Sequence, residues 1–343
     1  MLKKRSESVD FMRSIAIVIM IFANSFAYFL DNKSILWLRI LFSLAAPLFI
    51  FLSGYSFYVS FCKKNSIGMK LKQVILLFIS SVFIDVVIWD ILPFQTFDVL
   101  YLIATSILIN VLILIFNWKI KLIFAILIII ITPFLISKFN YQFSNEELKF
   151  NYIFDSKFKI ADLFKCRRFL IDGWFPVFPW IAISIIGNVA ANKSELIGKF
   201  IGTFKWLIIV LFFICLYFVF NQKVQLIRKE YMEIFYPAYP LFLSLSLLFI
   251  LLLIYTSEQL NYNLKFVILF CTLGRNSLFV YMLHLIIISN LINVISPSKI
   301  ENNVLLSLII LITVFISSNT LELIQKNKKL DFIPYYLKKI FGI

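Results

Sequence analysis

The chain has 343 residues, of which 62% are hydrophobic and 15% are charged, and its mean hydropathy is +0.95. This composition lies outside the range of soluble globular proteins and indicates a protein embedded in a bilayer. The net charge of +15 does not indicate nucleic-acid binding, because the basic residues stand in short clusters between apolar runs, as cytoplasmic loop anchors do.

Long apolar runs recur along the whole chain. Because a bilayer-spanning helix needs about 20 apolar residues, they predict an all-α polytopic membrane bundle of about ten helices. The predicted spans lie near residues 11–30, 35–61, 71–92, 97–117, 119–138, 174–191, 203–221, 234–255, 276–295 and 304–324. The first run is too long for the apolar core of a cleaved signal peptide. The distribution of Lys and Arg among the loops predicts that both termini are cytoplasmic.

The connection 138–173 is the one segment long enough to form structure outside the membrane, and we expect a partly ordered outer loop there. Residues 1–325 are assigned to one transmembrane domain. Residues 326–343 are assigned to a basic cytoplasmic tail with aromatic side chains, suited to the inner leaflet. The four cysteines have no metal-type spacing, so neither a metal site nor a disulfide is expected.

Two predicted helices carry polar residues at matching depths. Ionisable and strongly polar groups inside a membrane are costly, so each is a candidate functional residue. In the first helix Asp10 and Arg13 lie at the cytoplasmic end, and Asn24 lies about 16 Å deeper at a rise of 1.5 Å per residue. In the ninth helix Arg275 lies at the start, and the only histidine, His284, lies about 14 Å deeper.

This layout predicts a binding site if the two helices face one cavity. Arg13 and Arg275, together with Asn276, would hold a phosphorylated ligand that enters from the cytosol, because guanidinium matches phosphate geometry. His284 would then act as the general base, and Asn24 would orient an acyl carbonyl or stabilise its oxyanion. The alternatives are an imidazole that only bonds a neighbouring helix, and arginines that only extend to the inner interface.

Asp85 is the deepest carboxylate of the third predicted helix. It would either orient a catalytic imidazole or bind a sugar hydroxyl, or else pair with a helix-end arginine such as Arg39. The sequence leaves these alternatives open. We group Asp85 with Asp10 and Tyr101 as supporting residues of the predicted site.

Three motifs resemble the transmembrane acyltransferase superfamily. Residues 8–26 (SVDFMRSIAIVIMIFANSF) resemble its first membrane helix, with an Asp, two residues, an Arg, and a small-apolar run that ends in a polar residue. Residues 171–191 (IDGWFPVFPWIAISIIGNVAA) resemble the aromatic and proline-containing start of a later helix in the branch related to heparan-alpha-glucosaminide N-acetyltransferase. Residues 273–285 (LGRNSLFVYMLHL) are similar to that branch's late motif and are the most specific of the three.

The resemblance implies a bundle of ten or eleven helices that moves an acyl group across the membrane. The donor is commonly cytosolic acetyl-CoA, used as a substrate, and the acceptor is a carbohydrate hydroxyl or amine. The resemblance also implies that Arg13 lies near the acyl donor and that His284 belongs to the core motif. No metal is implied.

The sequence departs from the family pattern at several positions. Many relatives carry a histidine at or just after the position of Asn24, and some carry one at the position of Tyr101. Ser14 stands where relatives have glycine, and the first outer loop, residues 31–40, lacks the branch's catalytic histidine. Either His284 is the sole base, or the protein keeps the fold and has lost or altered the chemistry.

The predicted function is therefore that of an integral membrane acyltransferase acting on a glycan, glycolipid or cell-envelope precursor. One alternative is a carrier or flippase-like protein, for which Pro47 and Gly54 would supply a helix break. Another is a non-catalytic subunit of an envelope-modifying complex. A microbial plasma membrane is the expected location, and the lipid bilayer and a glycan acceptor are the expected partners. The sequence leaves the acceptor, the acyl group and the oligomeric state open, a homo-oligomer included.

Overall fold

A computed structural model gives the structure of the chain. It describes residues 7–29, 36–64, 66–141, 147–159, 162, 164–221, 233–294 and 303–326. Each of the ten predicted spans overlaps a helix, and the second span covers two helices. Among the described residues, seven helices are long and apolar enough to cross a bilayer, and an eighth crossing results if the bent pair α10 and α11 counts as one. The predicted all-α membrane fold is confirmed. The number of spans and the side of each terminus stay predictions, and all but the first residue of the predicted tail 326–343 lies outside the described residues.

Three helices expose long rows of large apolar side chains: α6 (Trp118–Lys138), α8 (Ser194–Asn221) and α12 (Asn303–Lys326). On α8, Trp206 is 70% exposed and Phe213 is 61% exposed. Contiguous apolar surface of this extent is unfavourable in water and is favourable against lipid tails. These faces are therefore the ones expected to contact lipid.

The chain forms two compact units. The first unit comprises Met1–Leu48, Trp206–Ile234 and Leu248–Ile343. The second unit comprises Phe49–Lys205 and Phe235–Leu247. The candidate residues of the first and ninth predicted helices belong to the first unit, whereas Asp85 and Tyr101 belong to the second.

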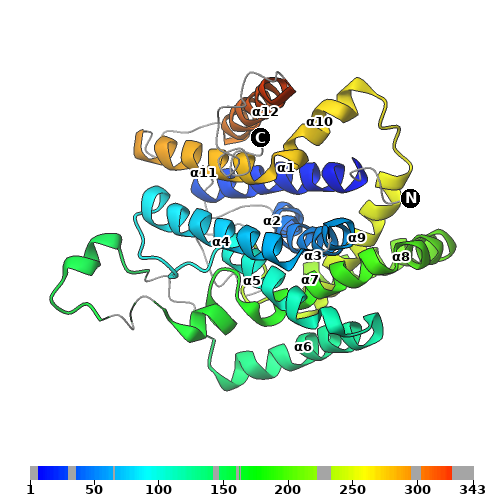
Figure 1. The fold of residues 1–343 in the computed structure, drawn as a ribbon, viewed down its shortest axis with the longest axis horizontal. Helices are drawn as coiled ribbons and strands as arrows, with labels where there is room; N and C mark the ends of the chain where they lie inside the picture. Colours follow the sequence, from blue (N-terminus) through cyan, green and yellow to red (C-terminus); the bar gives the residue numbers. More distant parts are fainter. Residues whose placement is uncertain are drawn as a thin grey trace. The chain divides into compact units, whose positions relative to one another are not determined.

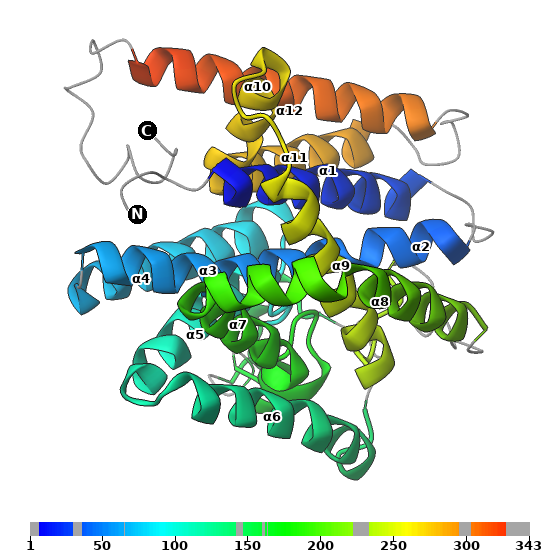
Figure 2. The same cartoon turned by 90° about the vertical axis from the view of Figure 1, so that its right-hand side faces the viewer.

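The first unit is built around α1 (Glu7–Phe29), which packs against α10 (Lys265–Arg275), α11 (Ser277–Val294) and α12 and also contacts α2 (Leu36–Ser43) (Figure 1). Figure 2 shows α12 running alongside α11. The acidic residues in the first turn of α1 interact favourably with the positive end of the helix dipole. This packing brings the N-terminal span against spans from the C-terminal end of the sequence.

The helices α10 and α11 form one apolar stretch that bends by 77° at Asn276. We call this bend the helix break. Only the part of the stretch that follows the break is predicted from the sequence as a span. The helix α10 has eleven residues, which is shorter than the length of about 20 residues that a helix needs to span a bilayer.

The second unit contains α3 (Ala45–Lys64) from Phe49 onward, together with α4 (Ile67–Phe83), α5 (Val99–Leu112), α6 and α7 (Val177–Asn192). In this unit α7 packs against α5 and α6, and α4 packs against α5. The side chain of Asn117 caps the first turn of α6, where it accepts a hydrogen bond from the N–H of Ile120. Asn117 therefore marks the boundary between the fourth and fifth predicted spans.

Two glycines let α3 and α7 approach each other closely. A Cβ atom on Gly54 would lie 1.8 Å from the peptide oxygen of Ser184, and one on Gly187 would lie 2.1 Å from a peptide oxygen of α3. Gly54 therefore serves helix packing. Near Pro47 the helix is interrupted at Leu44, between α2 and α3, although residues Leu36–Lys63 still count as one candidate span. At Gly54 the helix α3 continues.

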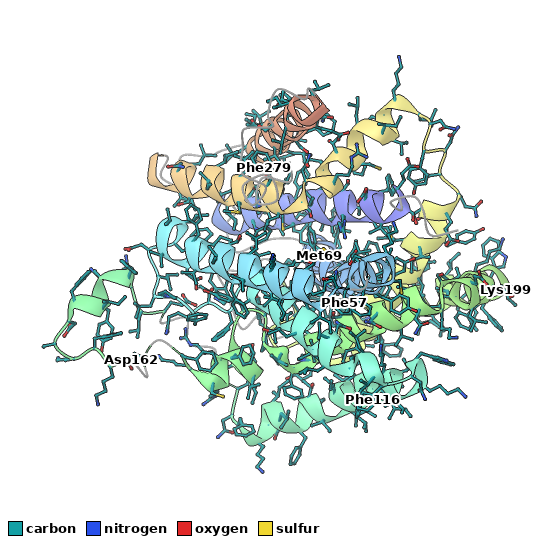
Figure 3. The ribbon with its side chains drawn as sticks, in the orientation of Figure 1. Phe57, Met69, Phe116, Asp162, Lys199 and Phe279 are labelled. Carbon is teal, nitrogen blue, oxygen red and sulfur yellow. The ribbon has the colours of Figure 1, made fainter. Side chains whose placement is uncertain are left out.

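The connection between α6 and α7 is structured over much of its length. It contains the short helices η3 (Phe150–Phe154) and η5 (Arg168–Asp172). Its contacts are with the loop that follows η1 (Ile84–Ile88), the continuation of α4. The peptide oxygen of Asp162, labelled in Figure 3, accepts a hydrogen bond from Nε2 of Gln95 at 2.5 Å. Such contacts agree with a partly ordered connection, and its location outside the cell stays a prediction.

Candidate functional site

The structure brings together Asn24 of α1 and His284 of α11. Nδ2 of Asn24 lies 3.0 Å from Nε2 of His284, and Nδ1 of His284 lies 3.2 Å from the peptide oxygen of Val280. A carbonyl oxygen only accepts, so the proton of the neutral ring is assigned to Nδ1. Nε2 is then the acceptor and takes a hydrogen bond from the amide of Asn24.

The imidazole is fully buried. The ring of Tyr281 packs edge-on against it, with 5.3 Å between the ring centroids. An unprotonated ring nitrogen and an amide donor are the two groups that general-base catalysis with carbonyl stabilisation uses, and here the amide occupies that nitrogen. The predicted contact between these two helices is present, and the predicted catalytic roles of His284 and Asn24 stay predictions.

Asp10 and Arg13 form an ion pair one turn into α1. Nη1 of Arg13 lies 3.3 Å from Oδ1 of Asp10, and the Asp10 side chain is 3% exposed whereas the Arg13 side chain is 20% exposed. The carboxylate therefore restrains the arginine while part of the guanidinium still reaches the surface. Contact of Arg13 with an acyl donor stays a prediction.

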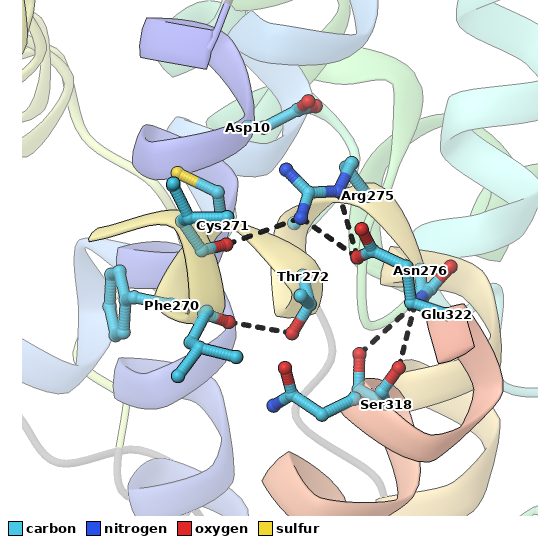
Figure 4. Close-up of polar contacts among 12 residues, drawn as sticks. Asp10, Phe270, Cys271, Thr272, Arg275, Asn276, Ser318 and Glu322 are labelled. Carbon is cyan, nitrogen blue, oxygen red and sulfur yellow. Dashed lines mark hydrogen bonds and ion pairs between the residues drawn. The ribbon is translucent and has the colours of Figure 1, made fainter. Parts of the chain in front are cut away.

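Arg275 and Asn276 both contact α12 at the helix break (Figure 4). Nη2 and Nε of Arg275 lie 2.8 and 3.1 Å from Oε2 of Glu322. Nδ2 of Asn276 donates to the peptide oxygen and to Oγ of Ser318, at 3.2 Å each. These side chains hold α12 against the helix break, a structural role that the sequence does not predict for them.

Glu322 and Ser318 are absent from the predicted site, although a signal for one of them exists. Glu322 is the only acidic residue of α12, and a single carboxylate in an apolar helix calls for a partner. What the sequence does not show is which of the basic residues pairs with it. Donor binding by Arg275 and Asn276 stays a prediction, and Glu322 competes with it for Arg275.

Asp85 is fully buried and its oxygens are occupied. Thr96 Oγ1 donates to Oδ1 at 2.6 Å, Tyr101 donates its hydroxyl to Oδ2 at 2.8 Å, and the N–H of Phe94 donates to Oδ2 at 3.1 Å. We call these four residues the Asp85 cluster. The three donors pin a loop in which Phe94 and Phe97 have positive φ values of 63° and 48°, a strained conformation for bulky residues.

Asp85 and His284 each form their described hydrogen bonds with other groups. Both ring nitrogens of His284 have other partners, Asn24 and Val280. The oxygens of Asp85 are taken up by its own loop, and Tyr101 belongs to the same cluster. The described contacts of Asp85 and Tyr101 give them a structural role, and their supporting role in the predicted site stays a prediction.

A second buried polar group of the second unit is not predicted from the sequence. Nζ of Lys121 lies 3.3 Å from Oδ1 of Asn188, and Nδ2 of Asn110 lies 3.1 Å from Oγ of Ser184. All four residues are buried, so these contacts hold α5, α6 and α7 together. In the part of the chain that the structure describes, no group of three or more His, Cys, Asp and Glu side chains is placed to hold a metal ion.

Residues 5–205 of the chain match a protein family described as heparan-alpha-glucosaminide N-acetyltransferase, catalytic. The match covers more than half of the chain and includes Arg13, Asn24 and Asp85. It ends before α10 and α11, so the site assignment of His284 depends on its motif and on its contact with Asn24. No curated protein matches the chain.

Proposed function

The chain belongs to the heparan-alpha-glucosaminide N-acetyltransferase catalytic family, and we propose that it is an integral membrane acetyltransferase. The donor is acetyl-CoA from the cytosol. The acceptor is an amine or hydroxyl of a glucosamine-type sugar in a glycan, glycolipid or cell-envelope precursor. The location is a microbial plasma membrane. Family membership supports acetyl transfer, and the apolar helices support a membrane location.

The observation that carries this proposal is the 3.0 Å contact between Asn24 and His284 inside the first unit. Nε2 of His284 removes the proton from the acceptor amine or hydroxyl as that group attacks the thioester carbonyl. The amide of Asn24 donates a hydrogen bond to the carbonyl oxygen as negative charge develops on it. The new C–N or C–O bond forms, the C–S bond breaks, and the CoA thiolate takes the proton from His284.

This reaction requires Asn24 and His284 to exchange partners. In the structure the Asn24 amide bonds Nε2, and during the reaction the acceptor takes the place of that amide. Because His284 has no exposed surface, the acceptor reaches Nε2 only when neighbouring side chains move aside. The enclosed site also excludes water, which would otherwise compete for the acetyl group.

Arg13 and Arg275 are the groups proposed to bind the phosphates of CoA. Their side chains are 20% and 21% exposed, so each guanidinium is partly accessible to a ligand. Each is also paired with a carboxylate, and phosphate would have to exchange with that partner. Guanidinium offers phosphate a bidentate contact that lysine does not.

The test is acetyl transfer across a reconstituted membrane. Proteoliposomes carry acetyl-CoA labelled with deuterium in the acetyl group on one side and a glucosamine-terminated oligosaccharide on the other. The proposal predicts an acceptor whose mass has risen by one labelled acetyl group. Absence of acetylated product with glucosamine-terminated, galactose-terminated and lipid-linked acceptors would contradict it.

One observation favours a second candidate, a carrier. Transporters often bind substrate at discontinuous helices, and α10 and α11 form such a pair with a bend of 77°. The same proteoliposomes distinguish the two functions. A carrier moves the sugar or the labelled anion without a covalent product, whereas an acetyltransferase forms the product even when neither compound accumulates.

A further inference from the structure

A side chain of α1 forms hydrogen bonds with two backbone groups of one turn of α10. In a regular helix the N–H of Gly274 bonds the carbonyl of Phe270. Here Oγ of Ser14 lies 2.9 Å from the nitrogen of Gly274 and 2.8 Å from the oxygen of Phe270. The N–H of Gly274 therefore donates to the Ser14 hydroxyl, and the hydroxyl donates to Phe270.

This hydroxyl contact stands immediately before the helix break. Side chains that bond both groups of one helical hydrogen bond are a recognised cause of sharp bends. The 77° bend follows at Asn276, two residues after Gly274. Ser14 is fully buried, and its hydroxyl also lies 2.9 Å from the peptide oxygen of Asp10. The hydroxyl thus lies among three backbone groups from two helices.

The backbones of α1 and α10 touch at the same place. A Cβ atom on Gly274 would lie 1.9 Å from the peptide oxygen of Asp10. A glycine at this position is therefore needed for Ser14 to reach the backbone of α10. The rings of Phe11 and Phe270 pack beside this contact, with 5.4 Å between their centroids.

The Ser14 contact and the Asn24 contact are spaced equally along the two chain segments. Asn24 follows Ser14 by ten residues, and His284 follows Gly274 by ten residues. After the helix break, α11 packs against α1 and reaches Asn24 with His284. The direction in which α11 leaves the break therefore decides whether Nε2 of His284 meets Asn24.

We propose that Ser14 is a positioning residue, whose hydroxyl fixes the bend between α10 and α11 and thereby places His284 against Asn24. The effect on activity rests on the proposed acetyltransferase function. The effect on the bend does not.

The test compares Ser14→Ala with Ser14→Gly. Alanine removes the hydroxyl and adds nothing in its place, so the N–H of Gly274 and the oxygen of Phe270 lose their contact with α1 and are free to bond each other as in a straight helix. Glycine leaves room for one water molecule, which has three polar partners there and can bridge the same groups. We expect Ser14→Ala to lower kcat about tenfold, the scale of one lost buried hydrogen bond, without raising KM for acetyl-CoA. Ser14→Gly should retain most of the wild-type kcat.

Ser25→Ala is the matched control. Ser25 is also fully buried on α1, and its hydroxyl donates only within the helix, to Ile21 at 2.7 Å. This variant should leave kcat and the bend unchanged. An equal loss of kcat in Ser25→Ala and Ser14→Ala would overturn the proposal, because any buried serine of α1 would then have the same effect.

A distance measurement tests the bend without reference to activity. Spin labels are placed at Phe266 of α10 and Asn290 of α11, both exposed, after replacement of the native cysteines. Ser14→Ala should shift or broaden the label distance, and Ser14→Gly should match wild type. If Ser14→Ala does not insert stably, a Ser14→Gly distance unlike that of wild type overturns the proposal. An unchanged distance in Ser14→Ala also overturns it. A shifted distance in a protein without acetyl transfer supports the role of Ser14 and contradicts the proposed function alone.

Discussion

The Asn24–His284 pair of the first unit and the Asp85 cluster of the second unit are both buried polar groups on apolar helices, but their hydrogen bonding differs. Nε2 of His284 is held by one side-chain amide. The carboxylate of Asp85 receives two hydroxyl groups and one peptide N–H. From the sequence both are costly groups at membrane depth. Only the structure distinguishes the His284 nitrogen, which has one side-chain partner, from the Asp85 carboxylate, which is held by two donors of one loop and by Tyr101 of α5.

The comparison shows that the depth of a polar residue in the membrane makes it a candidate functional residue. The number of its hydrogen-bond partners then indicates whether its role is reactive or structural. A group that takes up a proton must release its resting partner, and a single amide allows this at low cost. A carboxylate bound by three donors stabilises a strained loop and would leave those donors unsatisfied if it reacted. The expected effects of substitution therefore differ in kind between the two regions.

The largest expected loss of stability follows substitution of Asp85. Asp85→Ala leaves three buried donors without an acceptor, at a cost of about 1 to 3 kcal/mol each, so we expect the free energy of unfolding to fall by about 4 kcal/mol. Thermal unfolding in detergent measures it. Asp90→Asn, at an exposed position in the same loop, is the control and should change little. Catalytic loss in Asp85→Ala at unchanged stability would reverse the roles assigned to the two regions.

Gly274→Ala tests the close contact that supports the Asn24–His284 pair. The added Cβ atom would meet the peptide oxygen of Asp10 at 1.9 Å, so α1 and α10 must separate, at a cost of about 3 kcal/mol. Gly202→Ala on α8 is the control, because its Cβ atom meets nothing within 4 Å and alanine raises helix stability by about 1 kcal/mol. Equal melting temperatures for the two variants would contradict the close contact.

Asn24 is expected to act through its amide hydrogens. Asn24→Asp keeps the size of the side chain and replaces the donor with an acceptor. We expect Asn24→Asp and Asn24→Ala to lower kcat by about 100-fold each, the scale of one lost oxyanion donor. Steady-state rates with acetyl-CoA and the acceptor measure this. A fully active Asn24→Asp protein would show that the amide donates nothing to the reaction.

The smallest expected effect is that of Tyr101→Phe. It removes one of the three hydrogen bonds to Asp85, so the free energy of unfolding should fall by about 1.5 kcal/mol while kcat per folded molecule stays constant. Tyr152→Phe is the control, since the Tyr152 hydroxyl is solvent-exposed and makes a long contact of 3.4 Å. A change in kcat without a change in stability would place Tyr101 in the reaction instead.

The sequence predicts the helices well because the apolar runs are long, and each run overlaps a helix. It also predicts that Asn24 and His284 lie at similar depths, because the fixed rise of a helix converts residue spacing into depth. That the two side chains face each other is seen only in the structure. It does not predict the helix α10, which is short and only partly apolar. The contacts of Arg275 with Glu322 and of Asn276 with Ser318 depend on which helix packs beside the break, and periodicity within one helix carries no information on that choice.

The contact between Ser14 and Gly274 is another interaction that the sequence does not predict. As sequence positions they are a departure from a family pattern and one glycine of a motif. Their meaning appears only when the backbones of α1 and α10 lie in contact. Asp85 is the reverse case, since its depth makes it a candidate for chemistry and its three donors give it a structural role.

The most direct test of the central claim is single-turnover acetyl transfer by purified protein carrying His284→Gln, with Asn290→Ala as the control on the same helix. Glutamine preserves a polar side chain but does not act as a base near neutral pH. Asn290 is exposed and bonds only within α11, to Ile286. The account predicts a rate lowered by about 1,000-fold in His284→Gln and unchanged in Asn290→Ala. A His284→Gln protein that acetylates the acceptor at the wild-type rate would contradict it.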